Sequence, residues 1–267
     1  MVRRYTPEQI KQFGEDLTVW SNRARELSYR VYMHPFIDVA THELVNQGFR
    51  RRVQVLEHSI KGVFRALPAG AEDPTKSDRY DAACYLHCFV LNICGALDNL
   101  AQIWCAEAQV KNSDGDELKP LEIGLWPKNR TLRRSLKQNT SRVLTEKLEW
   151  LKYVSNYRHA VAHRTPLYVP PKVLNASQAE AYEDLERQLS AEVLYSEKIE
   201  RLFDQQDQLG AFFPIMMHSF REQAQPVMIH PQIIEDYANV VEIAEHLFED
   251  ISGLSQASMA STAGKAI

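Results

Sequence analysis

Polar side chains that can do acid–base chemistry gather in one short stretch, residues 156–164, which reads NYRHAVAHR. It holds two arginines, Arg158 and Arg164, and two histidines, His159 and His163. Imidazoles donate and accept protons near neutral pH, so the residue types favour a functional site. His159 and His163, four apart, share one face of a helix. Arg158 and His163, five apart, point about 140° away from each other, so they share a cleft only if the arginine reaches around.

The residues around this cluster predict that it lies at the C-terminus of a helix. Leu148, Leu151, Val154 and Tyr157 recur at helical spacing, and Pro166 stops the helix soon after the cluster. The helix dipole at such an end favours cations and tends to keep imidazoles protonated. An alternative interpretation is simple capping, in which basic side chains satisfy the last free carbonyls.

The rest of the chain predicts more helices and few strands. Thr6 followed by Pro7 is typical of a helix start, and Asp78 or Ser77 is expected to cap the most apolar helix. The predicted helices span residues 7–33, 37–66, 79–109, a segment from Thr140 or Ser141 through the cluster, 175–208 and 231–253. Short apolar runs at 212–217 and 226–229 indicate an irregular or two-stranded lid. We therefore expect one all-α domain over residues 1–253, with a disordered tail at 254–267.

Net charge argues against general nucleic-acid binding by the whole surface. The 267 residues carry a formal charge of −4, so such binding would depend on a local basic patch. The densest positive region contains Arg130, Arg133, Arg134, Lys137 and Arg142. It either holds phosphate or is an ordinary exposed helix face. For the arginines at 50–52, a solvated face is favoured over a phosphate patch.

The sequence excludes several common enzyme classes. It contains no Gly-rich phosphate loop, no GxSxG and no HExxH, so neither a metal nor a cofactor is expected. The four cysteines all lie in the predicted helix 79–109 and are expected to be reduced and buried. We find neither a signal peptide nor an apolar run of membrane-spanning length, so a cytoplasmic location and no membrane association are expected.

The helix at 79–109 is apolar on nearly every side, which predicts a place in the middle of a bundle. Asp98 lies on one stripe with Leu91 and Cys94. A buried carboxylate there must find a cation or several hydrogen-bond donors. The alternative is that Asp98 lies at an exposed edge or bonds to a neighbouring backbone.

The order Arg158-His159-Ala160-Val161-Ala162-His163 resembles the Arg-x4-His form of the HEPN superfamily motif, near the end of a helix in an all-helical protein. The resemblance covers chiefly residues 79–171. Asp98, in the preceding helix, matches the acidic residue that often accompanies the motif. Position 159 departs from the family, which most often has Asn or Asp after the arginine.

The resemblance implies a HEPN-like helical bundle with extra N- and C-terminal helices, and it allows a short β-hairpin. It implies pairing with a second copy and, in many members, metal-independent RNA cleavage. His163 would then act as general base or acid, and Arg158 would stabilise charge on the phosphate. Asp98 would orient Arg158, and His159 would contact substrate or the opposite protomer. Other members are catalytically silent modules that bind nucleotides or partners.

Candidate substrate contacts follow from this interpretation. They are Asn156, Tyr157, Arg164, Tyr168, Arg130, Arg133 and Arg134. The expected partners are a second copy of the chain, RNA or a nucleotide, and an antitoxin or another defence protein. Three hypotheses remain open: a ribonuclease, a non-catalytic binding module, and a purely structural helix cap.

Overall fold

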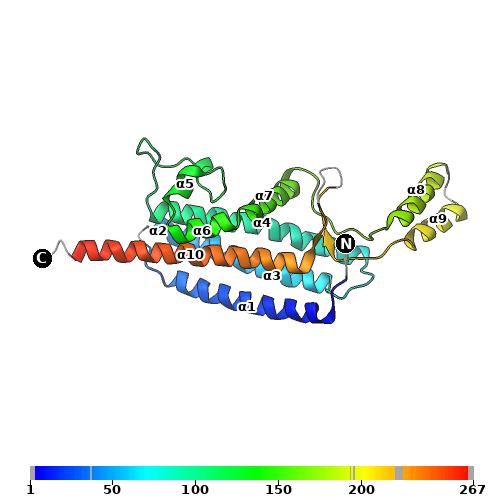
Figure 1. Cartoon of the computed structure of the whole chain (residues 1–267), viewed down its shortest axis with the longest axis horizontal. Helices are drawn as coiled ribbons and strands as arrows, with labels where there is room; N and C mark the ends of the chain where they lie inside the picture. The colour runs from blue at the N-terminus through cyan, green and yellow to red at the C-terminus, as the bar shows by residue number, and fades with distance from the viewer. Residues whose placement is uncertain (1–3, 37, 193, 195, 220–224, 264–267) are drawn as a thin grey trace.

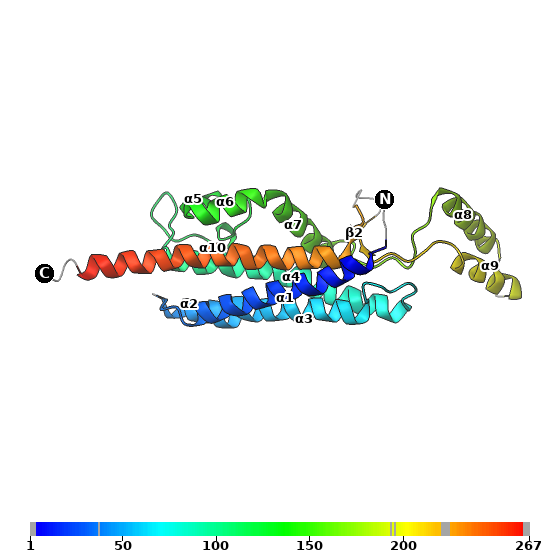
Figure 2. The same ribbon diagram turned by 60° about the horizontal axis from the view of Figure 1, so that its bottom comes forward.

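Long helices lying side by side along one axis form the body of the molecule (Figure 1). The computed structural model describes residues 4–36, 38–192, 194, 196–219 and 225–263. The long helices are α1 (Pro7–Tyr32), α3 (Arg50–Ala66), α4 (Lys76–Glu107) and α10 (Ile229–Ala263). Figure 2 shows α1 and α3 on one side of α4 and α10, with α5 (Arg130–Ser135), α6 (Gln138–Glu146) and α7 (Leu148–His163) on the other. The all-α prediction is confirmed.

Helix α1 begins where the sequence predicts. The Thr6 hydroxyl accepts a hydrogen bond from the Gln9 backbone N–H (3.3 Å), and the Gln9 side chain accepts one from the Thr6 N–H (2.9 Å). Pro7 occupies the first helical position, where its missing N–H has no cost. The helix ends at Tyr32, shortly before Pro35. Local chemistry therefore sets both ends of α1.

The helix predicted over 37–66 consists of three pieces. They are α2 (Val39–Glu43), a π-helical segment η1 (Leu44–Phe49) and α3, while Ile37 lies outside the described residues. Gly48 falls in η1, where a Cβ atom would lie only 3.0 Å from the side chain of Asn99. The widened turn and the missing side chain let this segment approach α4 closely.

One of the arginines expected on a solvated face lies between two helices instead. Arg52 is half-buried and donates to Asn99 Oδ1 (2.9 Å) and Asn92 Oδ1 (3.1 Å) of α4. Its guanidinium lies over Gly95, where any side chain would occupy the same space. Arg51, by contrast, is exposed as expected. The prediction was wrong for Arg52 because the opposing glycine makes room for it.

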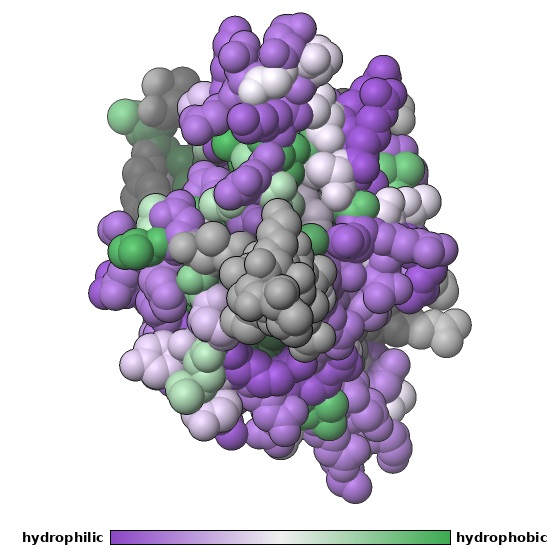
Figure 3. Space-filling model, turned by 90° about the vertical axis from the view of Figure 1, so that its left-hand side faces the viewer, coloured by the Kyte–Doolittle hydropathy of each residue, from purple (hydrophilic) through white to green (hydrophobic). Residues whose placement is uncertain are grey.

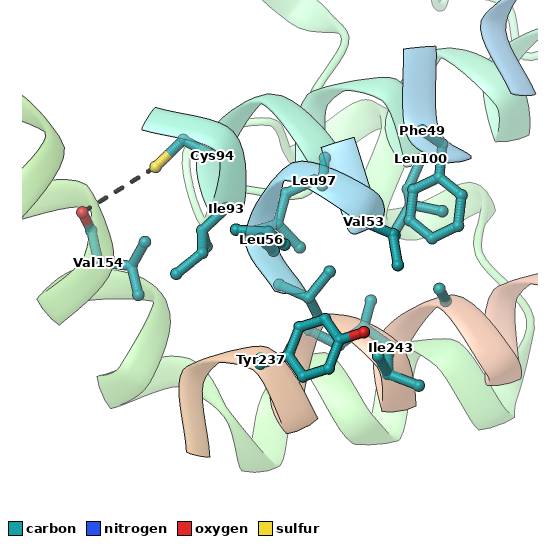
Figure 4. Close-up of a cluster of buried hydrophobic side chains, with 14 of the residues drawn as sticks. Phe49, Val53, Leu56, Ile93, Cys94, Leu97, Leu100, Val154, Tyr237 and Ile243 are labelled. Atoms are coloured by element: carbon teal, nitrogen blue, oxygen red, sulfur yellow. Dashed lines mark hydrogen bonds between the residues drawn. The ribbon is translucent and has the colours of Figure 1, made fainter. Parts of the chain in front are cut away.

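Helix α4 is the central element and starts earlier than predicted. Thr75, rather than Asp78 or Ser77, is its N-cap, and the Asp78 carboxylate accepts from the Thr75 N–H (2.9 Å). Figure 4 shows α4 side chains such as Leu97 and Leu100 among those of α3 and α10. By length and composition α4 is apolar enough to cross a membrane, but 56% of its most apolar window is buried inside the protein. That burial is typical of a core helix.

The contact of α7 with α4 fixes the helix that carries the polar cluster. In Figure 4 the Cys94 thiol of α4 points at the Val154 carbonyl oxygen of α7, 4.0 Å away. Leu151 and Val154 are also buried in this contact, as the periodicity predicted. Burial is the main reason that the pKa of Cys94 rises to about 12. The thiol is therefore a packing group.

The outward face of α4 differs from the prediction. Cys84 and Cys88 are exposed, and Leu91 is 41% exposed. Cys105 is half-buried, so Cys94 alone among the four thiols is fully buried. The expectation of four buried cysteines was wrong because α4 is covered by neighbours on some sides only.

The helix predicted from Thr140 or Ser141 through the cluster is interrupted at Lys147. This residue has φ −95° and ψ 19°, and its ammonium group donates to Asn239 Oδ1 (2.6 Å) and pairs with Glu242 (2.7 Å) of α10. Thr140 lies inside α6 and donates to Asp250 (2.6 Å) rather than capping a helix. Contacts with α10 thus turn one predicted helix into α6 and α7.

The chain after α7 forms a narrow two-stranded connection to a helical hairpin. Tyr168 bridges to Met217, and β1 (Ile215–Met216) pairs with β2 (Val227–Met228) in antiparallel register. This agrees with the predicted two-stranded lid. The single helix predicted over 175–208 is instead α8 (Ala176–Ser190) and α9 (Glu197–Asp207), which project away from the bundle (Figure 1).

Helix α10 begins at Ile229 and does not end at Gly253 as predicted. It continues to Ala263, so helix covers part of the segment for which a disordered tail was expected, and residues 264–267 lie outside the described ones. Figure 3, which views the molecule from the end where α10 finishes, shows mainly hydrophilic side chains with scattered hydrophobic ones.

Candidate functional site

Arg158 and His163 come together at the end of α7. Arg158 Nη1 lies 3.4 Å from His163 Nε2, so the arginine does reach around the helix. The His159 and His163 rings lie with their centroids 6.0 Å apart, and both are exposed. One guanidinium and two imidazoles thus share a small area open to solvent.

Asn156 holds the chain that leaves this helix. Arg164 donates to its side-chain oxygen (2.6 Å) and its backbone oxygen (3.1 Å). The Asn156 amide also lies 3.2 Å from Nε2 of the buried His218, whose ring packs edge-on against Tyr157. Asn156 therefore ties the last turns of α7 to Arg164, which follows the helix, and to the buried His218.

A groove of about 780 Å³ lies between α4, α7 and the connection that follows α4. We call it the α4–α7 groove. Its lining comprises Cys94, Asp98 and Gln102 of α4; Pro120, Leu121, Ile123, Trp126, Pro127, Lys128 and Asn129 of the connection; and Leu151, Lys152, Ser155, Asn156, Arg158 and His159 of α7. A second hollow of about 310 Å³ is lined by Asn156, His159, His163 and Arg164. Because Asn156 and His159 line both, the two hollows meet at the cluster.

Asp98 lies in the groove but does not contact Arg158. Its Oδ1 accepts a hydrogen bond from Trp126 Nε1 at 3.0 Å, and the residue is half-buried. The two charged groups act on Cys94 with opposite sign, Asp98 raising its pKa and Arg158 lowering it. Asp98 and Arg158 therefore lie near the same thiol without forming an ion pair with each other.

The charges around His159 oppose its protonation. Partial loss of contact with water lowers its pKa, and the positive charges of Arg158, His163, Arg164 and Lys128 lower it further. The helix dipole was expected to keep imidazoles here protonated. For His159 that expectation was wrong, because desolvation together with nearby full charges outweighs the partial charge at a helix end.

The two tyrosines predicted to bind substrate differ in access. Tyr157 is 4% exposed, and its ring packs against Tyr153 with 4.7 Å between centroids. Burial and Asp236 raise the pKa of Tyr157 to about 12. Tyr157 thus faces the core rather than a substrate, while Tyr168 is half-buried in the connection paired with Met217.

The predicted basic patch does not line the groove. Arg130 and Arg134 are exposed on α5, and Arg133 is half-buried with its guanidinium donating to the Leu125 carbonyl oxygen (2.7 Å). Burial lowers the pKa of Arg133. The lysines that do line the groove are Lys128 and Lys152.

Sequence reasoning missed several groove residues. Gln102 follows Asp98 by four positions, so helical spacing alone could have placed it on the same face. Trp126 and Lys128 come from an irregular connection without a periodic signal, and His218 lies 62 positions after its partner Asn156.

The comparisons with known proteins identify no family for this chain. No protein-family model matches the chain, and the comparisons with curated proteins and with solved structures found no match either. Within the described ranges, no group of three or more His, Cys, Asp or Glu side chains lies close enough to hold a metal ion.

Proposed function

We propose that this protein is a metal-independent endoribonuclease of HEPN type, with Arg158 and His163 as its central pair. The observation that carries the proposal is the distance of 3.4 Å between Arg158 Nη1 and His163 Nε2 on an exposed helix end. Both groups can therefore contact one phosphodiester at the same time. The adjoining groove supplies Lys128 and Lys152 for neighbouring phosphates.

The reaction these groups support is transesterification within RNA. A general base removes the proton of the ribose 2′-hydroxyl, and its oxygen attacks the adjacent phosphorus. The bond from phosphorus to the 5′-oxygen breaks, and a general acid protonates that oxygen. The products are a 2′,3′-cyclic phosphate and a 5′-hydroxyl. Arg158 donates to the non-bridging oxygens, where negative charge develops.

His159 is the second group for proton transfer in this proposal. Its lowered pKa keeps it neutral near pH 7, as a general base must be, and its ring lies 6.0 Å from that of His163. Two imidazoles at this separation can face the attacking and leaving oxygens of one phosphate. A second copy of the chain facing the groove, a cytoplasmic location and a role in defence or toxin–antitoxin biology complete the proposal.

The test is cleavage of RNA by the purified chain in the presence of EDTA. We expect cleavage by the unchanged protein, and loss of at least about 100-fold in Arg158→Ala and in His163→Ala, as is usual for acid–base and charge-stabilising groups. Arg51→Ala and His58→Ala, at exposed positions of α3, are the matched controls. Circular dichroism checks that each variant keeps its fold. Cleavage that survives both site substitutions would refute the proposal.

A second candidate function is nucleotide binding without catalysis. It is favoured by the volume of the α4–α7 groove, about 780 Å³, which is within the range of small-molecule sites. Saturable binding of RNA or a nucleotide with no product formed would support it over the nuclease.

A further inference from the structure

The α4–α7 groove is lined by both apolar and cationic side chains, and a nucleotide has both an apolar and an anionic part. The wall from the connection carries the apolar side chains of Leu121 (89% exposed), Ile123 and Trp126, together with Lys128 and Asn129. The opposite wall, from α7, carries Lys152 and Arg158. A nucleotide likewise joins a flat base, whose faces prefer apolar contact, to an anionic phosphate. The groove therefore offers apolar contacts for a base and the cationic side chains of Lys128, Lys152 and Arg158 for phosphate.

Asp98 supplies an acceptor between these walls. Trp126 Nε1 fixes its Oδ1 at 3.0 Å, and its Oδ2 makes no hydrogen bond within the part of the chain that the structure describes. An ionised carboxylate accepts hydrogen bonds and donates none. Since Arg158 does not pair with it, the free oxygen is available to a ligand in the groove.

We infer that the groove binds the nucleotide beside the scissile phosphate and that Asp98 selects a base with an exocyclic amino group, guanine above all. Guanine presents two neighbouring N–H donors on its Watson–Crick edge, whereas uracil presents a single N–H between two carbonyl oxygens. The carboxylate can accept both donors of guanine, whereas the two carbonyl oxygens of uracil oppose its approach. This inference rests on the proposed function and adds its substrate preference, and it makes Asp98 a specificity residue rather than the group that orients Arg158.

Cleavage of matched substrates tests the preference. The substrates are RNA oligonucleotides that differ only in the base next to the mapped cleavage site, which is guanine or uracil. We expect about tenfold or greater preference for guanine in kcat/KM, the size usual for one base contact. Asp98→Asn, which offers both an acceptor and a donor, should bring this ratio close to one through loss of the advantage of the guanine substrate. Asp81→Asn, at an exposed position of the same helix, is the control.

A uniform loss in Asp98→Asn, equal for both substrates, would show that Asp98 positions Arg158 and would overturn the inference. A ratio near one in the unchanged protein would overturn it too.

Measurements of nucleotide binding distinguish failure of this inference from failure of the nuclease proposal. Calorimetric titration with guanosine or uridine monophosphate needs no catalysis, and we expect tighter binding of the guanosine nucleotide, with the difference lost in Asp98→Asn. If RNA is not cleaved but this difference is found, the nuclease proposal fails and the binding preference stands. If cleavage depends on Arg158 and His163 but both nucleotides bind equally, the preference fails alone.

Discussion

The buried carboxylate of Asp236 should make the stability of this protein depend on pH. Asp236, on α10, is 2% exposed, and its Oδ1 accepts hydrogen bonds from Trp150 Nε1 and Gln232 Nε2, each at 2.8 Å. Burial raises its pKa from 3.8 to about 7, Glu235 adds to the rise, and the two hydrogen bonds oppose it. The variant we consider is Asp236→Asn, which keeps the shape of the side chain and removes its ionisable group.

Whether stability rises or falls with pH follows from comparing the pKa of Asp236 in the folded and unfolded states. The folded pKa, about 7, exceeds the unfolded value, so the folded state holds the proton over a wider pH range. The contribution to stability is fully present below about pH 4 and is lost as pH rises toward 7. A gap of roughly three pH units corresponds to about 4 kcal/mol in all, and the part lost between pH 5 and 8 is about 2 to 3 kcal/mol.

Urea denaturation at several pH values measures this loss. The free energy of unfolding of the unchanged protein should fall by about 2 to 3 kcal/mol relative to that of Asp236→Asn between pH 5 and 8. Glu183→Gln, at an exposed position of α8, should follow the unchanged protein. A difference between the unchanged protein and Asp236→Asn that stays constant across this range would show that Asp236 ionises normally, and the reasoning from burial would be refuted.

Asp236 also bears on the candidate site. Its partner Trp150 belongs to α7, and its charge raises the pKa of both Tyr153 and Tyr157 on the same helix. Asp236 thus contacts the side of α7 that faces the core.

Two further predictions concern α4. Gly95→Ala should displace the half-buried Arg52 and destabilise the fold by about 1 to 3 kcal/mol, whereas Gly14→Ala in α1, with nothing within 4 Å, should stabilise it by about 0.5 to 1 kcal/mol; urea midpoints measure both. A thiol reagent at neutral pH should label the two exposed cysteines of α4 in the native protein and reach Cys94, whose pKa is raised to about 12, only on unfolding. Labelling of Cys94 at the rate of the exposed thiols would contradict its place in the core.

The sequence by itself determined those features that depend on near neighbours in the chain. Thr6, Pro7 and Gln9 define the start of α1, and the residues before Pro166 define where α7 ends. The apolar spacing gave the side on which α7 packs, with Leu151 and Val154 buried. Capping, proline geometry and helical periodicity act over a few residues, so they can be read without coordinates.

Only the tertiary structure decided what surrounds the cluster. Lys147 breaks a predicted helix because Asn239 and Glu242 of α10 hold it, and no local signal reveals them. Asp98 accepts a hydrogen bond from Trp126 and does not pair with Arg158, because the irregular connection after α4 brings Trp126 next to it. Partners distant in sequence become neighbours only when the helices pack, so the groove and the charges in it belong to the fold as a whole.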